Sequence, residues 1–215
     1  LPLTASRATV RAAVNAITAP ARSGGTTAVA GMQGAWYTLS PRWQNQWPNI
    51  ANNSTIGRLP LPYNTRNMNK AVVILTDGDN NWQGLYSSAV RGSPTATELL
   101  YNAYGRAADW NAQFPGNQIS PINASNADAR LDGRFSAICS AMKGPDAANP
   151  RMRIYVIGFE IQNPTNSTTA AVRSMLQACA TRPEAPYYLE APDAAALQGA
   201  FTTVANSLAS LRMVE

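Results

Sequence analysis

The sequence predicts an α/β protein whose sheet is mostly parallel and flanked by helices. Short aliphatic runs at 71–75, 153–159 and 187–189 are separated by longer segments with helical periodicity, which is the order typical of α/β folds. The first two runs are continuous and rich in β-branched residues. They show no alternation with polar residues, which indicates strands covered on both faces. We therefore expect these two runs to form adjacent parallel strands in the core.

Helices are predicted where apolar side chains recur at spacings of three and four residues. The clearest case is the segment 192–213, in which Leu197, Phe201, Val204 and Leu208 share one face. The other helical segments are 4–18, 26–39, 94–112, 128–143 and 167–180.

Two long irregular stretches, near 40–70 and 113–127, interrupt this pattern. We interpret them as insertions in a single domain spanning residues 1–215, because the length suits one core and the sequence shows neither an internal repeat nor a linker. Aromatic residues gather around the first stretch. They either form a partner-binding patch or pack the loop onto the domain, and they comprise Trp36, Tyr37, Trp43, Trp47 and Tyr63.

Composition excludes several classes of function. The chain has no histidine, which removes Ser-His-Asp and Cys-His catalysis and every histidine metal site. Oxygen ligation of a hard cation, Mg²⁺ or Ca²⁺, remains. The net charge is +5, but the arginines are scattered rather than gathered in a basic stripe, which disfavours nucleic acid as a partner. The longest aliphatic run, 71–75, is far too short to span a bilayer.

Polar residues follow the first predicted strand directly, as Thr76-Asp77-Gly78-Asp79. In open parallel sheets, ligand sites form beyond the carboxyl ends of the strands, so Asp77 is a candidate ligand. An isolated Asp-Gly pair is more often an ordinary turn. The segment Gly24-Gly25-Thr26 likewise brings a hydroxyl to the start of a helix, where Thr26 is either a ligand or an ordinary N-cap.

Taken together, Gly24-Gly25-Thr26 and Thr76-Asp77-Gly78 resemble the second and third motifs of a von Willebrand factor A domain. Within that superfamily the chain is most similar to the Tad pilus assembly (TadG-like) family. That similarity covers nearly the whole chain and rests on Leu39-Ser40-Pro41, Thr76-Asp77-Gly78-Asp79-Asn80, Ile138-Cys139, Tyr155-Val156-Ile157-Gly158-Phe159, Leu176-Gln177-Ala178-Cys179-Ala180 and Tyr187-Tyr188.

The resemblance implies a doubly wound sheet that carries a divalent cation at its carboxyl edge. Thr26 and Asp77 would be the second- and third-motif ligands, and an acidic group of a protein partner would complete the coordination of the cation. The resemblance also implies a disulfide between Cys139 and Cys179, which a cell-envelope compartment favours.

The first motif of the family, Asp-x-Ser-x-Ser, is absent, because none of the aspartates begins that pattern. The chain starts at Leu1 without a signal peptide, and we expect it to be the carboxyl-terminal portion of the domain, without the first three strands. We therefore expect weak or no Mg²⁺ binding by this chain alone. We also expect the strand at 71–75 to lie at an exposed sheet edge, covered by the missing N-terminal segment or by a second copy.

The predicted function is a non-enzymatic protein-binding module of the bacterial cell envelope, periplasmic or at the cell surface, that serves a Tad-type pilus. The alternative is a structural or assembly domain with a vestigial cation site. A third hypothesis, a hydrolase using Asp77, Asp79 and Glu160, is disfavoured because the chain has no histidine and no paired acid–base motif.

Overall fold

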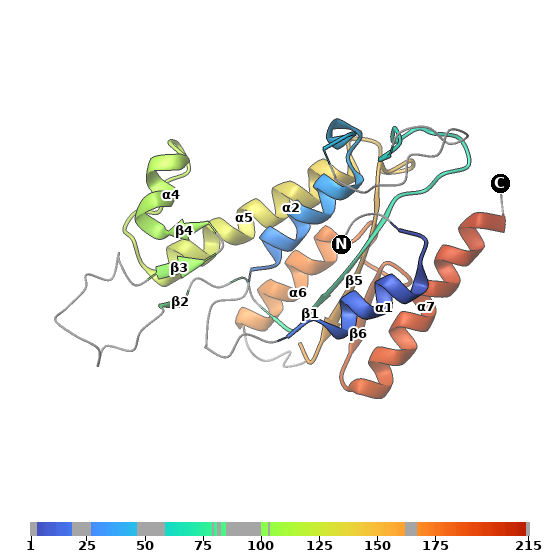
Figure 1. The fold of residues 1–215 in the computed structure, drawn as a ribbon. Helices are drawn as coiled ribbons and strands as arrows, with labels where there is room; N and C mark the ends of the chain where they lie inside the picture. The colour runs from blue at the N-terminus through green and yellow to red at the C-terminus, as the bar shows by residue number, and fades with distance from the viewer. Residues whose placement is uncertain are drawn as a thin grey trace.

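The computed structural model describes residues 4–18, 27–46, 59–78, 80, 83–84, 100–102, 104–161 and 167–213. Figure 1 shows a layer of helices on each side of a central sheet. The helices are α1 (Arg7–Asn15), α2 (Ala28–Leu39), η1 (Pro41–Trp43), α4 (Ala107–Gln113), α5 (Ala124–Lys143), α6 (Ser167–Cys179) and α7 (Ala194–Met213). The strands are β1 (Ala71–Thr76), β2 (Gln83–Gly84), β3 (Leu100–Asn102), β4 (Gly105–Arg106), β5 (Arg153–Phe159) and β6 (Tyr188–Ala191).

The central sheet consists of the three strands that the sequence predicts, in the order β1-β5-β6, and all of them are parallel. Val72 of β1 pairs with Ile154 of β5, and Val156 of β5 pairs with Tyr188 of β6. The α/β class and the parallel pairing of the first two runs are therefore confirmed. Because all three strands run the same way, their carboxyl ends meet at one edge of the sheet.

Helices cover the sheet unequally on its two faces (Figure 1). On one face, Val72 and Ile74 of β1 and Ile154 and Val156 of β5 join a large core with α2, α5 and α6. The opposite face carries a smaller core that α7 forms with β5 and β6. This arrangement is compatible with a Rossmann-like α/β fold.

The prediction that both faces of β1 are covered is wrong. Strand β5 is buried along nearly its whole length, but β1 alternates, and the side chains of Val73 and Leu75 are 41% and 48% exposed. The physical reason lies in the position of the strand. β1 stands at the end of the described sheet, and α7 packs mainly on β6 and β5, so among the described residues the Val73 and Leu75 side of β1 stays partly exposed.

The predicted helix 94–112 is confirmed over 107–112, within α4, and is wrong over 100–102 and 105–106. Residues 100–102 and 105–106 form strands β3 and β4, which pair with each other and with β2 in a small antiparallel sheet. The helix α4 begins only at Ala107. Gly105 has a φ of 91°, a conformation that ends a helix and favours a tight hairpin. Residues 94–99 and 103 of the predicted helix lie outside the described part of the chain.

Helix α5 begins four residues before the predicted start at 128. The side chain of Asn123 accepts a hydrogen bond from the backbone N–H of Asn126, which satisfies one of the free donors of the first turn. The helix ends at Gly144, which has a φ of 77°. Glycine adopts this conformation readily because it has no β-carbon.

The described part of the stretch 40–70 packs onto the domain. Trp36 Nε1 donates a hydrogen bond to Tyr63 Oη over 3.1 Å, and the rings of Tyr37 and Trp43 stack at 4.3 Å. These four residues favour the packing interpretation over a free aromatic patch. Trp47 lies outside the described residues.

Candidate functional site

The carboxyl end of β1 presents the candidate ligand Asp77 directly after the strand. Thr76, the last strand residue, is buried, and its hydroxyl accepts a hydrogen bond from the backbone N–H of Gly78. This bond turns the chain at the sheet edge and leaves the Asp77 side chain exposed. Asp77 therefore occupies the position at which ligand sites form in parallel sheets.

Asn80 ties this edge to two helices. Its side chain is almost completely buried; Oδ1 accepts the backbone N–H of Ala28 at 2.8 Å, and Nδ2 donates to Asp132 Oδ1 at 3.1 Å. The first turn of α2 and the middle of α5 therefore meet beside the end of β1. The sequence interpretation missed Asn80 and Asp132 as contact residues. The sequence does place an asparagine directly after Thr76-Asp77-Gly78-Asp79. Nothing local identifies its hydrogen-bond partners, because they lie 52 residues away in each direction.

The second candidate ligand, Thr26, lies outside the described residues, as does Asp79. The proximity of Thr26 to Asp77 therefore stays a prediction. Thr27, the next residue, is the N-cap of α2, yet its side chain makes no capping hydrogen bond. The Thr27 Oγ1 atom is buried and has no hydrogen-bond partner in the described part of the chain.

The described residues do not by themselves fit a divalent cation. Magnesium requires near-octahedral oxygen coordination, and calcium takes six to eight oxygens. Within the described ranges no group of three or more His, Cys, Asp or Glu side chains is placed to hold a metal ion. Both polar atoms of the Asn80 side chain already hydrogen-bond, to Ala28 and to Asp132.

An open cavity of about 620 Å³ lies beside the same edge, between α5 and α6. It is lined by Asn80, by Ser125, Asp128, Asp132 and Ser136 of α5, and by Val172 and Met175 of α6. The two carboxylates give this side of α5 an acidic character.

A disulfide joins α5 to α6 under the sheet. Cys139 and Cys179 are both about 1% exposed, with an S–S distance of 2.10 Å and a Cα–Cα distance of 5.1 Å. The Cα–Cα separation falls within the range that a disulfide requires. The pairing that the resemblance implies is therefore present in the structure.

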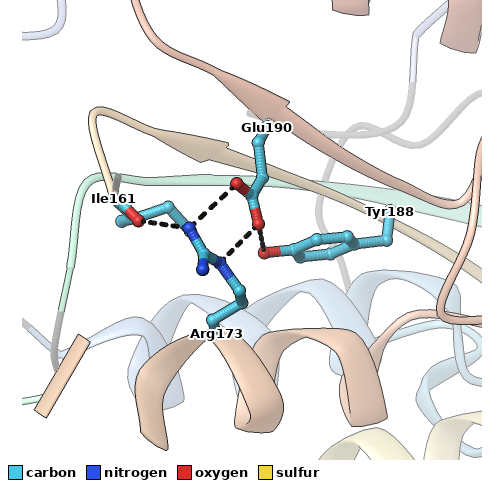
Figure 2. A network of polar contacts seen from close by, with 4 residues as sticks. All are labelled: Ile161, Arg173, Tyr188 and Glu190. Carbon is cyan, nitrogen blue, oxygen red and sulfur yellow. Dashed lines mark hydrogen bonds and ion pairs between the residues drawn. The ribbon is translucent and has the colours of Figure 1, made fainter. Parts of the chain in front are cut away.

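A polar network fastens α6 to the carboxyl ends of β5 and β6. Figure 2 shows the guanidinium of Arg173 between the carboxylate of Glu190 and the carbonyl of Ile161. Arg173 Nε lies 2.6 Å from Glu190 Oε1, an ion-pair distance without hydrogen-bond alignment, while an Nη atom donates to Glu190 Oε2 at 3.1 Å. Tyr188 Oη donates to Glu190 at 2.8 Å. Burial raises the pKa of Tyr188 well above its usual value, and the hydrogen bond to Glu190 raises it further. The network is structural, because its charges satisfy one another.

The free edge of β1 borders a groove on the α2 side. A cavity of about 260 Å³ is lined by Ala28, Gly31, Met32 and Ala35 of α2 and by residues 72–75 of β1. Among the described strands, only β5 pairs with β1. We call this feature the β1 edge groove. Its position agrees with the predicted exposed edge.

Comparison of the chain with protein-family models, with curated proteins and with solved structures found no match. None of the described helices is both long and apolar enough to cross a membrane.

Proposed function

We propose that this chain is a non-enzymatic protein-binding module of the bacterial cell envelope, of the von Willebrand factor A type found in Tad pilus assembly. The resemblance carries the family and the compartment. The parallel sheet with helices on both faces is compatible with it, and the disulfide suits an oxidising compartment. The observation that carries the binding role is the β1 edge groove.

The β1 edge groove has the properties of a strand-docking surface. An unpaired strand edge presents a row of backbone N–H and C=O groups to which another strand can add. Residues 71–76 carry no charge that would repel such a strand. On one side of the added strand, Val73 and Leu75 are exposed apolar neighbours. On the other side, Ala28, Gly31 and Ala35 of α2 leave room for its side chains. The ligand is therefore an extended, apolar protein segment.

The proposal also includes a divalent-cation site, to which this chain contributes only part of the ligands. Thr26 and Asp77 would hold Mg²⁺ or Ca²⁺ only with ligands from elsewhere, and a partner carboxylate would complete the shell. The alternative is an assembly domain in which the site is vestigial. The absence of the first motif, Asp-x-Ser-x-Ser, favours that alternative for the sequence as given. Calorimetric titration of Mg²⁺ into a polypeptide extended beyond Leu1 separates the two. Binding that is lost in Asp77→Ala supports the cation site, and no heat of binding supports the assembly domain.

Native mass spectrometry and sizing chromatography of the 215-residue chain test the docking role. We expect a dimer or a complex with a strand-forming segment, because the exposed edge favours pairing. Val73→Lys places a charge on the exposed face of β1 and should shift the chain to monomer. Phe201→Lys, at a 44% exposed apolar residue of α7, is the matched control and should leave the assembly unchanged. A chain that is monomeric before and after Val73→Lys, and that captures no strand, contradicts the proposed docking role.

A further inference from the structure

Another cavity, of about 320 Å³, lies between α4 and α5. It shares no lining residue with the β1 edge groove. Figure 1 places α4 alongside the amino-terminal half of α5, at one end of the molecule. Trp110 of α4 and Phe114 just after it form one wall, and Arg130 and Arg134 of α5 line the other. We call it the arginine cavity.

Helix α5 separates two cavities of opposite charge. Ala129 and Gly133, small and exposed, line both of them. Asp128 and Asp132 line the cavity toward α6, whereas Arg130 and Arg134 line the arginine cavity. Acidic and basic residues thus alternate along 128–134. Because a helix turns by about 100° per residue, residues two positions apart lie on roughly opposite sides, so the acidic and basic side chains face different cavities. The arginine cavity therefore has a basic lining.

Arg134 is held over aromatic rings. Its guanidinium carbon lies 4.9 Å from the ring centre of Phe114, 5.1 Å from that of Tyr104 and 5.8 Å from that of Trp110. Its Nε donates to Tyr104 Oη at 3.3 Å. The rings attract the cation through their quadrupoles and restrict its rotamers. The guanidinium is thereby positioned in advance, and within the described residues its two Nη atoms make no hydrogen bond and can reach a further acceptor.

The walls of the cavity are themselves fixed. Trp110 is 2% exposed, its Nε1 donates to the Asn117 carbonyl at 2.8 Å, and its ring packs against Phe114 at 4.5 Å. Arg130 Nε donates to the Gln118 carbonyl at 3.1 Å. In the part of the chain that the structure describes, the ion pair is Arg173 with Glu190, and no carboxylate pairs with either arginine of this cavity. Among the described residues, the two arginines therefore face one open space with no carboxylate paired to them.

We propose that the arginine cavity binds a carboxylate that is attached to an apolar group. The planar fork of Arg134 matches the two oxygens of a carboxylate, and Arg130 adds charge at the rim. Phe114 and the edge of Trp110 receive the apolar part. The same chemistry occurs at the C-terminus of a peptide that ends in an apolar residue and in a free arylalkanoic acid. This site is independent of the proposed strand docking at β1.

The test uses the full chain and N-acetyl-phenylalanine as the probe, with titration followed by the NMR shifts of the Arg134 Nε–H and the Trp110 Nε1–H. N-acetyl-phenylalaninamide has the same shape without the charge and should bind about tenfold more weakly, because it forfeits a charge-assisted pair. Arg134→Gln should lose a similar factor. Arg134→Lys keeps the charge but not the planar fork, so it should weaken the binding of N-acetyl-phenylalanine by a smaller factor than Arg134→Gln. Arg182→Gln, at an exposed arginine before β6, is the control and should bind like the parent chain.

The two sources are distinguished with 3-phenylpropanoate, which lacks the peptide amide. Tighter binding of N-acetyl-phenylalanine supports a peptide C-terminus, and equal binding supports a free acid; either result agrees with a carboxylate site. Equal binding of the acid and the amide by the parent chain overturns the proposal, and so does undiminished binding by a folded Arg134→Gln. The comparison of acid with amide needs no variant, so a failure of Arg134→Gln to fold leaves the test intact.

Discussion

Lys70 shows how the burial of one charge orders a long loop. The side chain is 7% exposed and stands before β1, where Nζ donates hydrogen bonds to the carbonyls of Leu39 and Leu61 and lies 4.8 Å from the ring centre of Tyr63. It thereby joins the end of α2, the loop and the sheet. Burial lowers the pKa of Lys70 to about 8, because the charged form loses its hydration.

This pKa predicts a specific dependence of stability on pH. The unfolded chain, with the ordinary lysine pKa of 10.5, binds more protons than the folded chain between pH 8 and 10.5. The free energy of unfolding should therefore rise with pH across this window, by at most about 1.4 kcal/mol per pH unit. The neutral amine still has two N–H donors for its two carbonyls, so the hydrogen bonds persist.

Urea unfolding of the parent chain and of Lys70→Met at pH 7.5, 8.5 and 9.5 measures this effect. The variant should be less stable throughout, because two carbonyls lose their donor, but it should lack the rise contributed by Lys70. Other titrating groups, Lys143 and Tyr188 among them, cancel in the difference between the two curves. Arg66→Gln, at an exposed position in the same loop, should follow the parent. Parallel curves of stability against pH for the parent and Lys70→Met would show that the pKa of Lys70 is not lowered.

At the scale of the element, β1 and β5 have similar sequences and different surroundings. Both are continuous aliphatic runs, yet β5 lies between two strands and under helices on both faces. Among the described elements, β1 pairs with β5 alone, and its residues alternate between buried and exposed. Adjacent residues of β1 therefore have opposite environments: Ile74 packs in the core with α2 and α5, and Val73 is 41% exposed.

The pair Ile74→Asp and Val73→Asp tests this placement with matched substitutions. Ile74→Asp buries an unpaired carboxylate and should destabilise the fold by more than about 4 kcal/mol, enough to unfold a marginally stable domain. Val73→Asp leaves its carboxylate in water and should cost less than about 1 kcal/mol. Denaturant unfolding followed by circular dichroism measures both. Equal destabilisation by the two substitutions would contradict the side-chain alternation in β1.

At the scale of the molecule, the disulfide links the two helices that cover the same face of the sheet. Cys139 of α5 and Cys179 of α6 lie on either side of β5 in the sequence, 40 residues apart. Closing a loop of that length removes unfolded-state entropy, worth roughly 4 kcal/mol in the chain-entropy model.

Intact mass with and without reductant should therefore differ by two hydrogens for the native chain. Reduction should lower the free energy of unfolding by about 2–4 kcal/mol, within the usual range for a native bridge. The double variant Cys139→Ala, Cys179→Ala is the control, whose stability should not respond to the reductant. Alkylation of two thiols in the unreduced native chain would contradict the bridge.

Prediction from sequence succeeded where the signal is local. The aliphatic run 153–159 matches β5 exactly in its bounds, and the periodicity of 192–213 matches α7 to within two residues. It failed at 100–102 and 105–106, where apolar spacing indicated a helix but strands β3 and β4 pair, Tyr101 with Arg106. At the candidate site, Asp77 was predicted from its place after a strand. Asn80 and Asp132 were not, because their contact joins residues 52 apart.

The sequence by itself determined the three strands of the central sheet and most of the helices, since a run of β-branched residues or a spacing of three and four acts within a few neighbours. Through a family resemblance it also indicated the cysteine pair. Only the tertiary structure decided that one face of β1 is open, that Asn80 bridges α2 and α5, and that Arg134 stands among three rings. These features depend on which distant segments share a surface. That choice is made by the packing of the whole chain, because burial and pairing energies are gained only when those segments meet.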